Sequence, residues 1–108
     1  MKKYRNKPCQ IGAEKYRSQR EAKRHQDLLV LVRAGHVLDL RREVAFELAP
    51  AVVLDGRRKP AVRYFADFVF RTPLGEQIVE DAKGVRTPVY RLKRHLMKTV
   101  HGIEIKEI

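Results

Sequence analysis

The sequence predicts a single α+β (α/β) domain in which two helices flank a four-stranded mixed sheet. The expected order is helix, three strands, helix, strand. Three observations support this class: helix-start signals at two places, segments of alternating apolar and polar residues, and a length of 108 residues, which suits one domain. Residues 18–108 are expected to form this domain. Residues 1–17 are expected to be a basic arm, because they carry six cations among few apolar side chains: Lys2, Lys3, Arg5, Lys7, Lys15 and Arg17.

The first helix is expected to begin at Ser18. Ser18 and Glu21 form a capping-box pattern, in which the serine hydroxyl and the glutamate three positions later satisfy free amides at a helix start. Gly35 predicts an end near Ala34. The expected buried stripe of this helix consists of Leu28, Leu29 and Val32.

Three strands are expected to follow. Alternation indicates the first strand over Leu38–Leu48, and Pro50 ends it. Residues 55–59 are expected to be a basic loop. Aromatic and β-branched residues then indicate a strand over 61–71, and residues 76–83 form the next.

A second helix is expected to begin at Thr87-Pro88, which provides an N-cap and a proline at the first helical position. Residues 103–108 alternate again and are expected to complete the sheet. The expected buried stripe of this helix consists of Val89, Leu92, Leu96 and Val100.

The charge balance predicts DNA or another nucleic acid as partner. Lys and Arg number 24 against 13 Asp and Glu, and a net charge of +11 on so small a chain attracts polyanions. A solvated basic surface without a partner is the alternative. We expect no membrane partner and a cytoplasmic protein, because no run approaches the ~18 apolar residues of a spanning helix. Cys9 is the only cysteine, so a metal would need oxygen or histidine ligands.

The turn at residues 72–75 predicts the register of one strand pair. Its sequence, Thr-Pro-Leu-Gly, is typical of a three-residue hairpin loop with a bulge. If Thr72 faces Glu76, then Asp67 faces Asp81. The same count places Lys83 opposite Phe65.

Two carboxylates placed opposite each other destabilise a sheet unless a positive charge lies between them. A divalent cation is the expected occupant, and magnesium leaves room for a phosphate and a water. Alternation puts Lys83 on the face of Asp81 and Glu80 on the other face. Lys83 could then position the attacking water and neutralise charge on the phosphate. A cross-strand salt bridge on a solvated sheet face is the alternative.

Asp67 on one strand and Asp81-Ala82-Lys83 on the next, in this order of elements, resemble the PD-(D/E)XK nuclease superfamily, which includes restriction enzymes and Holliday junction resolvases. Ala66 stands where the superfamily name has proline, a position that varies among members. More narrowly, four motifs resemble a phage-borne family of unknown function assigned to that superfamily: Tyr16-x-Ser18-x-x-Glu21-Ala22, Ala66-Asp67-Phe68, Asp81-x-Lys83-Gly84 and Thr87-x-x-Tyr90-x-x-Lys93.

The resemblance implies a restriction-endonuclease-like core with a metal centre. Asp67 and Asp81 would bind Mg²⁺, for which Mn²⁺ would substitute, and the Ala82 carbonyl would complete the ligand shell. Lys83 would be catalytic, and Glu21 would reach the same centre from the first helix. The implied setting is a bacterial cytoplasm that holds a phage or prophage.

Several residues near this centre could instead be purely structural. The capping box alone would account for Glu21. His25, one turn further along the helix, is expected to be structural rather than part of the site. Tyr90, Lys93 and Arg94 are expected to contact DNA phosphates, with a solvated basic face as the alternative.

The expected function is therefore a magnesium-dependent DNA endonuclease, with branched or structured DNA in recombination or DNA processing as a candidate substrate. A homodimer would place two centres on two strands. The alternative is a non-catalytic, basic nucleic-acid-binding module, which explains the charge but not the opposed aspartates.

Overall fold

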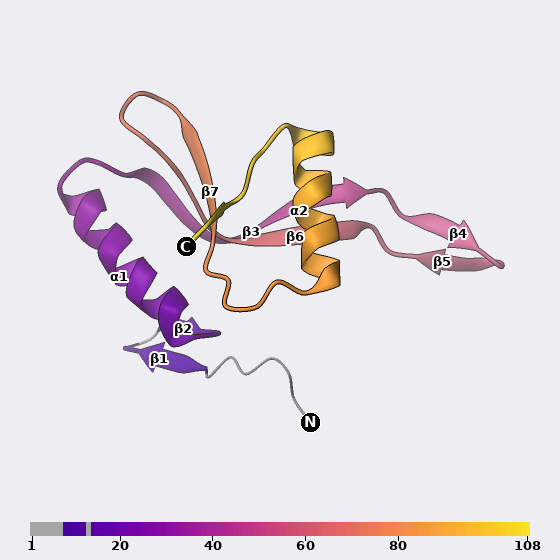
Figure 1. The fold of residues 1–108 in the computed structure, drawn as a ribbon, viewed down its shortest axis with the longest axis horizontal. Coiled ribbons are helices and arrows are strands. Elements are labelled where there is room, and N and C mark those ends of the chain that lie inside the picture. Colours follow the sequence, from indigo (N-terminus) through magenta and orange to yellow (C-terminus); the bar gives the residue numbers. More distant parts are fainter. Residues whose placement is uncertain (1–7, 13) are drawn as a thin grey trace.

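The computed structural model describes residues 8–12 and 14–108. Within them, a four-stranded sheet has the strand order β3-β6-β7-β8 (Figure 1). β3, β6 and β7 are antiparallel neighbours, and β8 runs parallel to β7. The α+β class and the mixed sheet are therefore confirmed.

The elements of the main body are two helices and the four sheet strands: α1 Gln19–Arg33, α2 Pro88–His101, β3 Leu38–Ala49, β6 Val62–Arg71, β7 Gln77–Asp81 and β8 Lys106–Glu107. Two small hairpins complete the described chain: β1 Cys9–Ile11 with β2 Glu14–Tyr16, and β4 Val52–Leu54 with β5 Arg57–Lys59. No helix in the described part of the chain is both long and apolar enough to span a bilayer.

Both helices begin where the capping residues predict. The Ser18 hydroxyl accepts a hydrogen bond from the Glu21 amide at 3.1 Å, and the Thr87 hydroxyl accepts one from the Tyr90 amide at 3.0 Å. α1 ends before Ala34, as expected. α2 ends at His101 and is capped by Gly102, whose positive φ of 68° suits glycine.

The register of the β6–β7 hairpin is confirmed. Val69 pairs with Val79, and the Thr72 amide donates to the Glu76 carbonyl at the turn. The expectation that β7 reaches Lys83, opposite Phe65, is wrong. The strand ends at Asp81 because the next amide, that of Ala82, donates to a side chain of β6 instead of its backbone.

The sheet has a hydrophobic core on each face. On one face, Leu28 of α1 packs with Phe68 and Phe70 of β6. On the other, Tyr90 and Met97 of α2 pack with a second group of sheet residues, which includes Tyr64, Ala66, Val69 and Val79. The helices thus flank the sheet, as predicted.

The buried face of α1 differs from the expected stripe. Leu28 is fully buried, but Val32 is 38% exposed and Leu29 is only partly buried. Side chains near the start of the helix face the sheet instead, so polar groups there are buried. Its buried residues are Glu21, Ala22, His25 and Leu28.

The expected stripe of α2 is also wrong. Val89, Leu92 and Val100 are 62%, 59% and 51% exposed, and only Leu96 is partly buried against the core. The bulkier Tyr90 and Met97, seven positions apart and therefore on one helical face, fill the core. The apolar stripe flanks this face.

Two hairpins lie where the sequence predicted a loop and an arm. The expected basic loop at 55–59 is the turn and second strand of the β4–β5 hairpin, with Asp55 and Gly56 both at positive φ. The described part of the expected N-terminal arm contains the β1–β2 hairpin. Four of its predicted cations lie outside the described residues: Lys2, Lys3, Arg5 and Lys7.

Glu80, which the alternation places away from Asp81, provides a stability prediction. It is fully buried, and its carboxylate accepts two hydrogen bonds from Arg24 of α1, at 2.9 and 2.6 Å. Arg24→Ala should lower the free energy of unfolding by about 3 kcal/mol in a urea titration, because a buried carboxylate would lose its partner. The control Lys23→Ala, which removes an exposed pair with Asp27, should change it by less than about 0.5 kcal/mol. Equal effects of the two substitutions would contradict this role for Arg24.

Candidate active site

The start of α1 and the segment after β7 border a cavity of about 190 Å³. Arg17, Ser18 and the 82–85 segment form part of its wall. The cavity brings together the four residues that the sequence predicted for an active centre: Glu21, Asp67, Asp81 and Lys83.

The two carboxylate oxygens of Glu21 have different surroundings. One takes part in capping the helix, and the other does not. Its Oε1 accepts a hydrogen bond from the Arg17 amide at 2.9 Å, just before the helix start. Its Oε2 is buried without a hydrogen-bond partner among the described residues. The nearest cation is Arg42, whose Nη2 is 3.6 Å away. A buried carboxylate oxygen without a hydrogen bond is costly unless a ligand compensates it.

Asp67 is buried and fully hydrogen-bonded. Its Oδ1 lies 2.5 Å from the Arg17 guanidinium, and its Oδ2 accepts a hydrogen bond from the Ala82 amide at 2.8 Å. Burial, and then the nearby charge of Asp81, raise the pKa of Asp67 to about 7. The contact of Ala82 is thus through its N–H, and the expected metal contact of its carbonyl stays a prediction.

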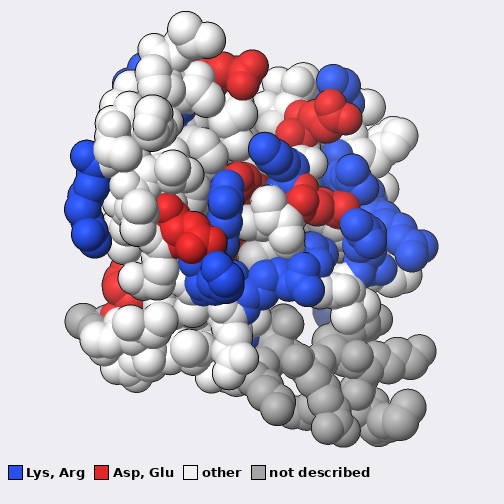
Figure 2. Space-filling view, turned by 60° about the vertical axis from the view of Figure 1, so that its left-hand side comes forward, with Lys and Arg blue, Asp and Glu red and all other residues white. Residues whose placement is uncertain are grey.

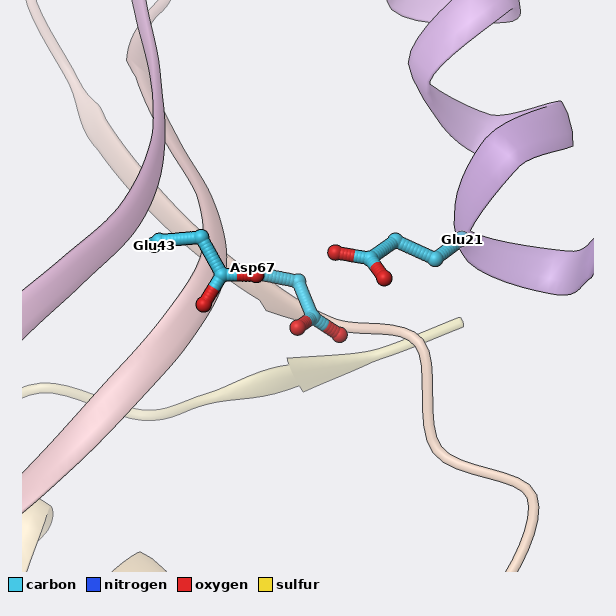
Figure 3. Close-up of side chains that lie close together, drawn as sticks. All are labelled: Glu21, Glu43 and Asp67. Carbon is cyan, nitrogen blue, oxygen red and sulfur yellow. The ribbon is translucent and has the colours of Figure 1, made fainter. Parts of the chain in front are cut away.

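Glu43 is a third acidic residue at this place, and the sequence did not single it out. Carboxylate oxygens of Glu21, Glu43 and Asp67 lie within 4.8 Å of one another. Figure 3 shows Glu43 and Asp67 on neighbouring strands and Glu21 reaching toward them from α1. An acidic residue next to Arg41 and Arg42 was the only signal, and it is a weak one.

The backbone of Glu43 explains why simple alternation misses it. Its φ is 55°, in the left-handed region, which is uncommon for residues other than glycine. In the β3–β6 ladder, Arg42 pairs with Phe68 and Val44 pairs with Ala66. No pair is formed at Glu43, which lies between these two positions. The alternation of β6 changes at the same place. Tyr64 and Ala66 face the core on the α2 side before it, and Val69 faces that core after it.

Asp81 holds Lys83 rather than joining the three-carboxylate cluster. Its Oδ2 accepts a hydrogen bond from the Tyr64 hydroxyl at 2.6 Å, and its Oδ1 is 3.6 Å from the Lys83 ammonium. Burial and the charge of Asp81 raise the pKa of Tyr64, so this phenol stays a donor. The Lys83 ammonium also lies 4.4 Å from the centre of the Tyr90 ring. The ammonium is thus fixed at the cavity.

The predicted DNA contacts on α2 divide into two groups. Lys93 lines a second hollow of about 200 Å³, together with Lys83 and Phe65, and it belongs to the same side as the acidic cavity. Arg94 lies 3.5 Å from Glu107, and the Tyr90 hydroxyl donates to the same carboxylate at 2.8 Å. Lys93 is therefore the better placed of the three for a phosphate.

His25 has a structural role, as expected. Its Nδ1 lies 2.6 Å from the Tyr16 hydroxyl, and its ring stacks on Phe68. Burial, and then the nearby Arg42, lower the pKa of His25. The neutral ring thus joins the β1–β2 hairpin to the core.

Arg17 is the cation that contacts Asp67 and Glu43 in the acidic cluster, as Arg42 is for Glu21. The Nη2 of Arg17 is 3.6 Å from Glu43 as well as bonded to Asp67, and its side chain is 58% exposed. Acidic groups also lie among Lys and Arg side chains on the face shown in Figure 2. The sequence placed Arg17 in the basic arm and did not predict this contact.

A family model described as "Protein of unknown function (DUF1064)" matches residues 1–106. The chain belongs to this family. Neither the curated proteins nor the solved structures gave a match. Because the description of DUF1064 assigns no activity, the function has to be argued from the cavity.

The raised pKa of Asp67 predicts a pH-dependent stability. The folded chain holds a proton on this carboxyl up to about pH 7, whereas an unfolded chain releases it near the ordinary value of ~3.9. Raising the pH between these values therefore destabilises the folded state. The test compares the Tm of Asp67→Asn with that of the wild type in the presence of a chelator. The difference, variant minus wild type, should increase by at least about 4 °C between pH 5 and pH 8, which corresponds to a loss of ~1 kcal/mol of wild-type stability.

The control for this experiment is Asp27→Asn, which removes an exposed carboxylate of α1. Its Tm difference from the wild type should stay nearly constant over the same pH range. A constant difference for Asp67→Asn would show that this carboxyl is not held in the protonated form.

Proposed function

We propose that this chain is a divalent-metal-dependent DNA endonuclease that hydrolyses phosphodiester bonds. The observation that carries the proposal is the buried carboxylate of Glu21, whose Oε2 has no hydrogen bond and which clusters with Asp67 and Glu43. Glu21 and Asp67 line a cavity that also holds Lys83. The net charge of +11 supplies the attraction for DNA.

The donor set fits a hard divalent cation. Carboxylate oxygens are the ligands that Mg²⁺ and Mn²⁺ take in proteins, and the three of Glu21, Glu43 and Asp67 lie within reach of a common point. When bound, such a cation supplies Lewis-acid stabilisation of the phosphate and activates a water. Asp81 would join the ligands only if its contacts with Tyr64 and Lys83 changed.

The chain's own residues have separable roles in this proposal. Lys83, held by Asp81 and the Tyr90 ring, would neutralise charge that builds on the phosphate as water attacks. Lys93 would hold a neighbouring phosphate. Arg17 is exposed enough to leave the carboxylates for the DNA backbone when the cation binds. Water and the phosphodiester would give a phosphomonoester and a free hydroxyl.

The substrate and the setting are further parts of the proposal. Contacts between cations and phosphates carry no sequence information, which favours recognition of DNA structure, such as branches, over recognition of a base sequence. DNA as the substrate fits a cytoplasmic protein in a host that carries a phage. A homodimer would bring two such cavities to two strands.

Glu21→Gln tests the proposal because it keeps the side-chain carbonyl that the Arg17 amide needs while removing the charge. We expect it to fold, to lose Mn²⁺ binding in a calorimetric titration, and to cut a four-way junction or a supercoiled plasmid at least about a hundredfold more slowly. Lys83→Ala should keep Mn²⁺ binding and lose cutting to a similar extent.

The matched control is Asp27→Asn, an exposed carboxylate on the same helix, which should bind Mn²⁺ and cut like the wild type. If the wild type binds both DNA substrates but cuts neither with Mg²⁺ or Mn²⁺, the proposal is wrong. Cutting by Glu21→Gln at the wild-type rate would move the centre elsewhere.

A non-catalytic nucleic-acid-binding module is the second candidate, and one observation favours it. The Arg17 guanidinium already contacts Asp67 and lies 3.6 Å from Glu43, where it takes the place of a metal cation. If the site is a metal centre, Arg17 competes for it, and Arg17→Gln should tighten Mn²⁺ binding in the absence of DNA by about tenfold or more, a change of ~1.4 kcal/mol. Absence of Mn²⁺ binding in both proteins would favour the module without catalysis.

A further inference from the structure

The β4–β5 hairpin extends the β3–β6 strand pair away from the body of the molecule, at the right in Figure 1. Every residue from Val52 to Lys59 is exposed. Its two-residue turn, Asp55-Gly56, has both φ angles positive, at 51° and 74°, as in the tight turns that join twisted antiparallel strands. The hairpin is thus well defined but contributes no residue to either core cluster.

The two strands of this hairpin differ in chemistry. β5 consists of Arg57, Arg58 and Lys59, and none of the three forms a salt bridge with another described residue. β4 consists of three apolar residues that are 47%, 68% and 56% exposed: Val52, Val53 and Leu54. Each apolar residue is paired across the hairpin with a cation. The hairpin thus presents exposed apolar and unpaired basic side chains side by side, a pattern typical of a contact surface.

The chemistry and shape of the hairpin suit the groove of a nucleic-acid duplex. The major groove of B-form DNA is wide enough, at ~12 Å, to admit a two-stranded ribbon. Cations along one strand can follow the phosphates while apolar side chains of the other contact base edges such as the thymine methyl. A protein partner would need acidic groups matched to all three cations, whereas every duplex presents phosphates at regular intervals.

The distance from the acidic cavity matches one turn of a duplex. Lys59 precedes Asp67 by eight positions and Gly56 precedes it by eleven. At ~3.3 Å per residue, the cations begin about 26 Å from Asp67 and the tip lies at most about 36 Å from it. One turn of B-form DNA spans about 34–36 Å.

We propose that the β4–β5 hairpin is a groove-binding ribbon that holds duplex DNA about one helical turn from the bond placed at the acidic cavity. Val52 and Leu54, which point to the same face of the hairpin, enter the groove, and Arg57, Arg58 and Lys59 contact the phosphates beside it. This inference rests on the proposed function for its ligand, but it concerns binding rather than cutting.

The test is duplex binding in chelator, where no cutting interferes. The triple variant Arg57→Gln, Arg58→Gln, Lys59→Gln should reduce the slope of log K against log salt by about 2.7, because each lost phosphate contact removes ~0.9. A control with the same loss of charge on the body, Lys23→Gln, Arg33→Gln, Lys106→Gln, should change the slope by less than one. Equal slopes for the two triple variants would overturn the proposal.

One further measurement separates a groove contact from a general charge effect. Val52→Ser with Leu54→Ser should weaken duplex binding several-fold without changing the salt slope; unchanged affinity would overturn the groove-entry part.

These outcomes are separate from those of the nuclease proposal. Duplex binding with the expected slopes but no cutting with Mg²⁺ or Mn²⁺ would support the ribbon and refute the nuclease. Cutting by the wild type, together with hairpin variants that bind duplexes like the wild type, would support the nuclease and refute the ribbon. Failure of the wild type to bind any duplex would overturn the ribbon.

Discussion

Four carboxyl groups are buried among the residues that the structure describes, and the structure between α1 and the sheet depends on how each is compensated. Arg24 neutralises Glu80, and the Tyr64 hydroxyl and Lys83 contact Asp81. Asp67 takes the Ala82 amide and the Arg17 guanidinium. Glu21 has a buried oxygen, Oε2, without a hydrogen bond among the described residues, and its nearest cation is Arg42 at 3.6 Å. Such compensation is needed because an unpaired buried charge costs several kcal/mol.

The same compensation decides where the strands end and where the cavity opens. β7 stops at Asp81 because the Ala82 amide donates to Asp67, and the chain can then turn to place Lys83 over the Tyr90 ring. On the opposite strand, the left-handed backbone of Glu43 interrupts the ladder beside Asp67. Asp67 and Asp81 border the cavity at the place where both strands depart from the regular ladder.

Much of this arrangement could be predicted from local signals. Ser18 and Thr87 mark helix starts, Thr72-Pro73-Leu74-Gly75 sets the hairpin register, and that register brings Asp67 and Asp81 to one place. The errors come from interactions that are not local. Val89, Leu92 and Val100 have ideal helical spacing but lie beside the core that Tyr90 and Met97 fill. Glu43 reaches the site through a backbone irregularity, and Arg17 reaches it from the segment between β2 and α1. Strand alternation predicts neither.

We propose that Glu21 and Asp67 hold a divalent cation and that Arg17 takes its place when no metal is bound. A crystal soaked with Mn²⁺ and measured for anomalous scattering tests this most directly, because it locates the ion without depending on activity. We predict one anomalous peak bordered by Glu21 and Asp67, with the Arg17 guanidinium displaced from Asp67. No peak, with Arg17 still bonded to Asp67 at high Mn²⁺ concentration, would contradict this claim.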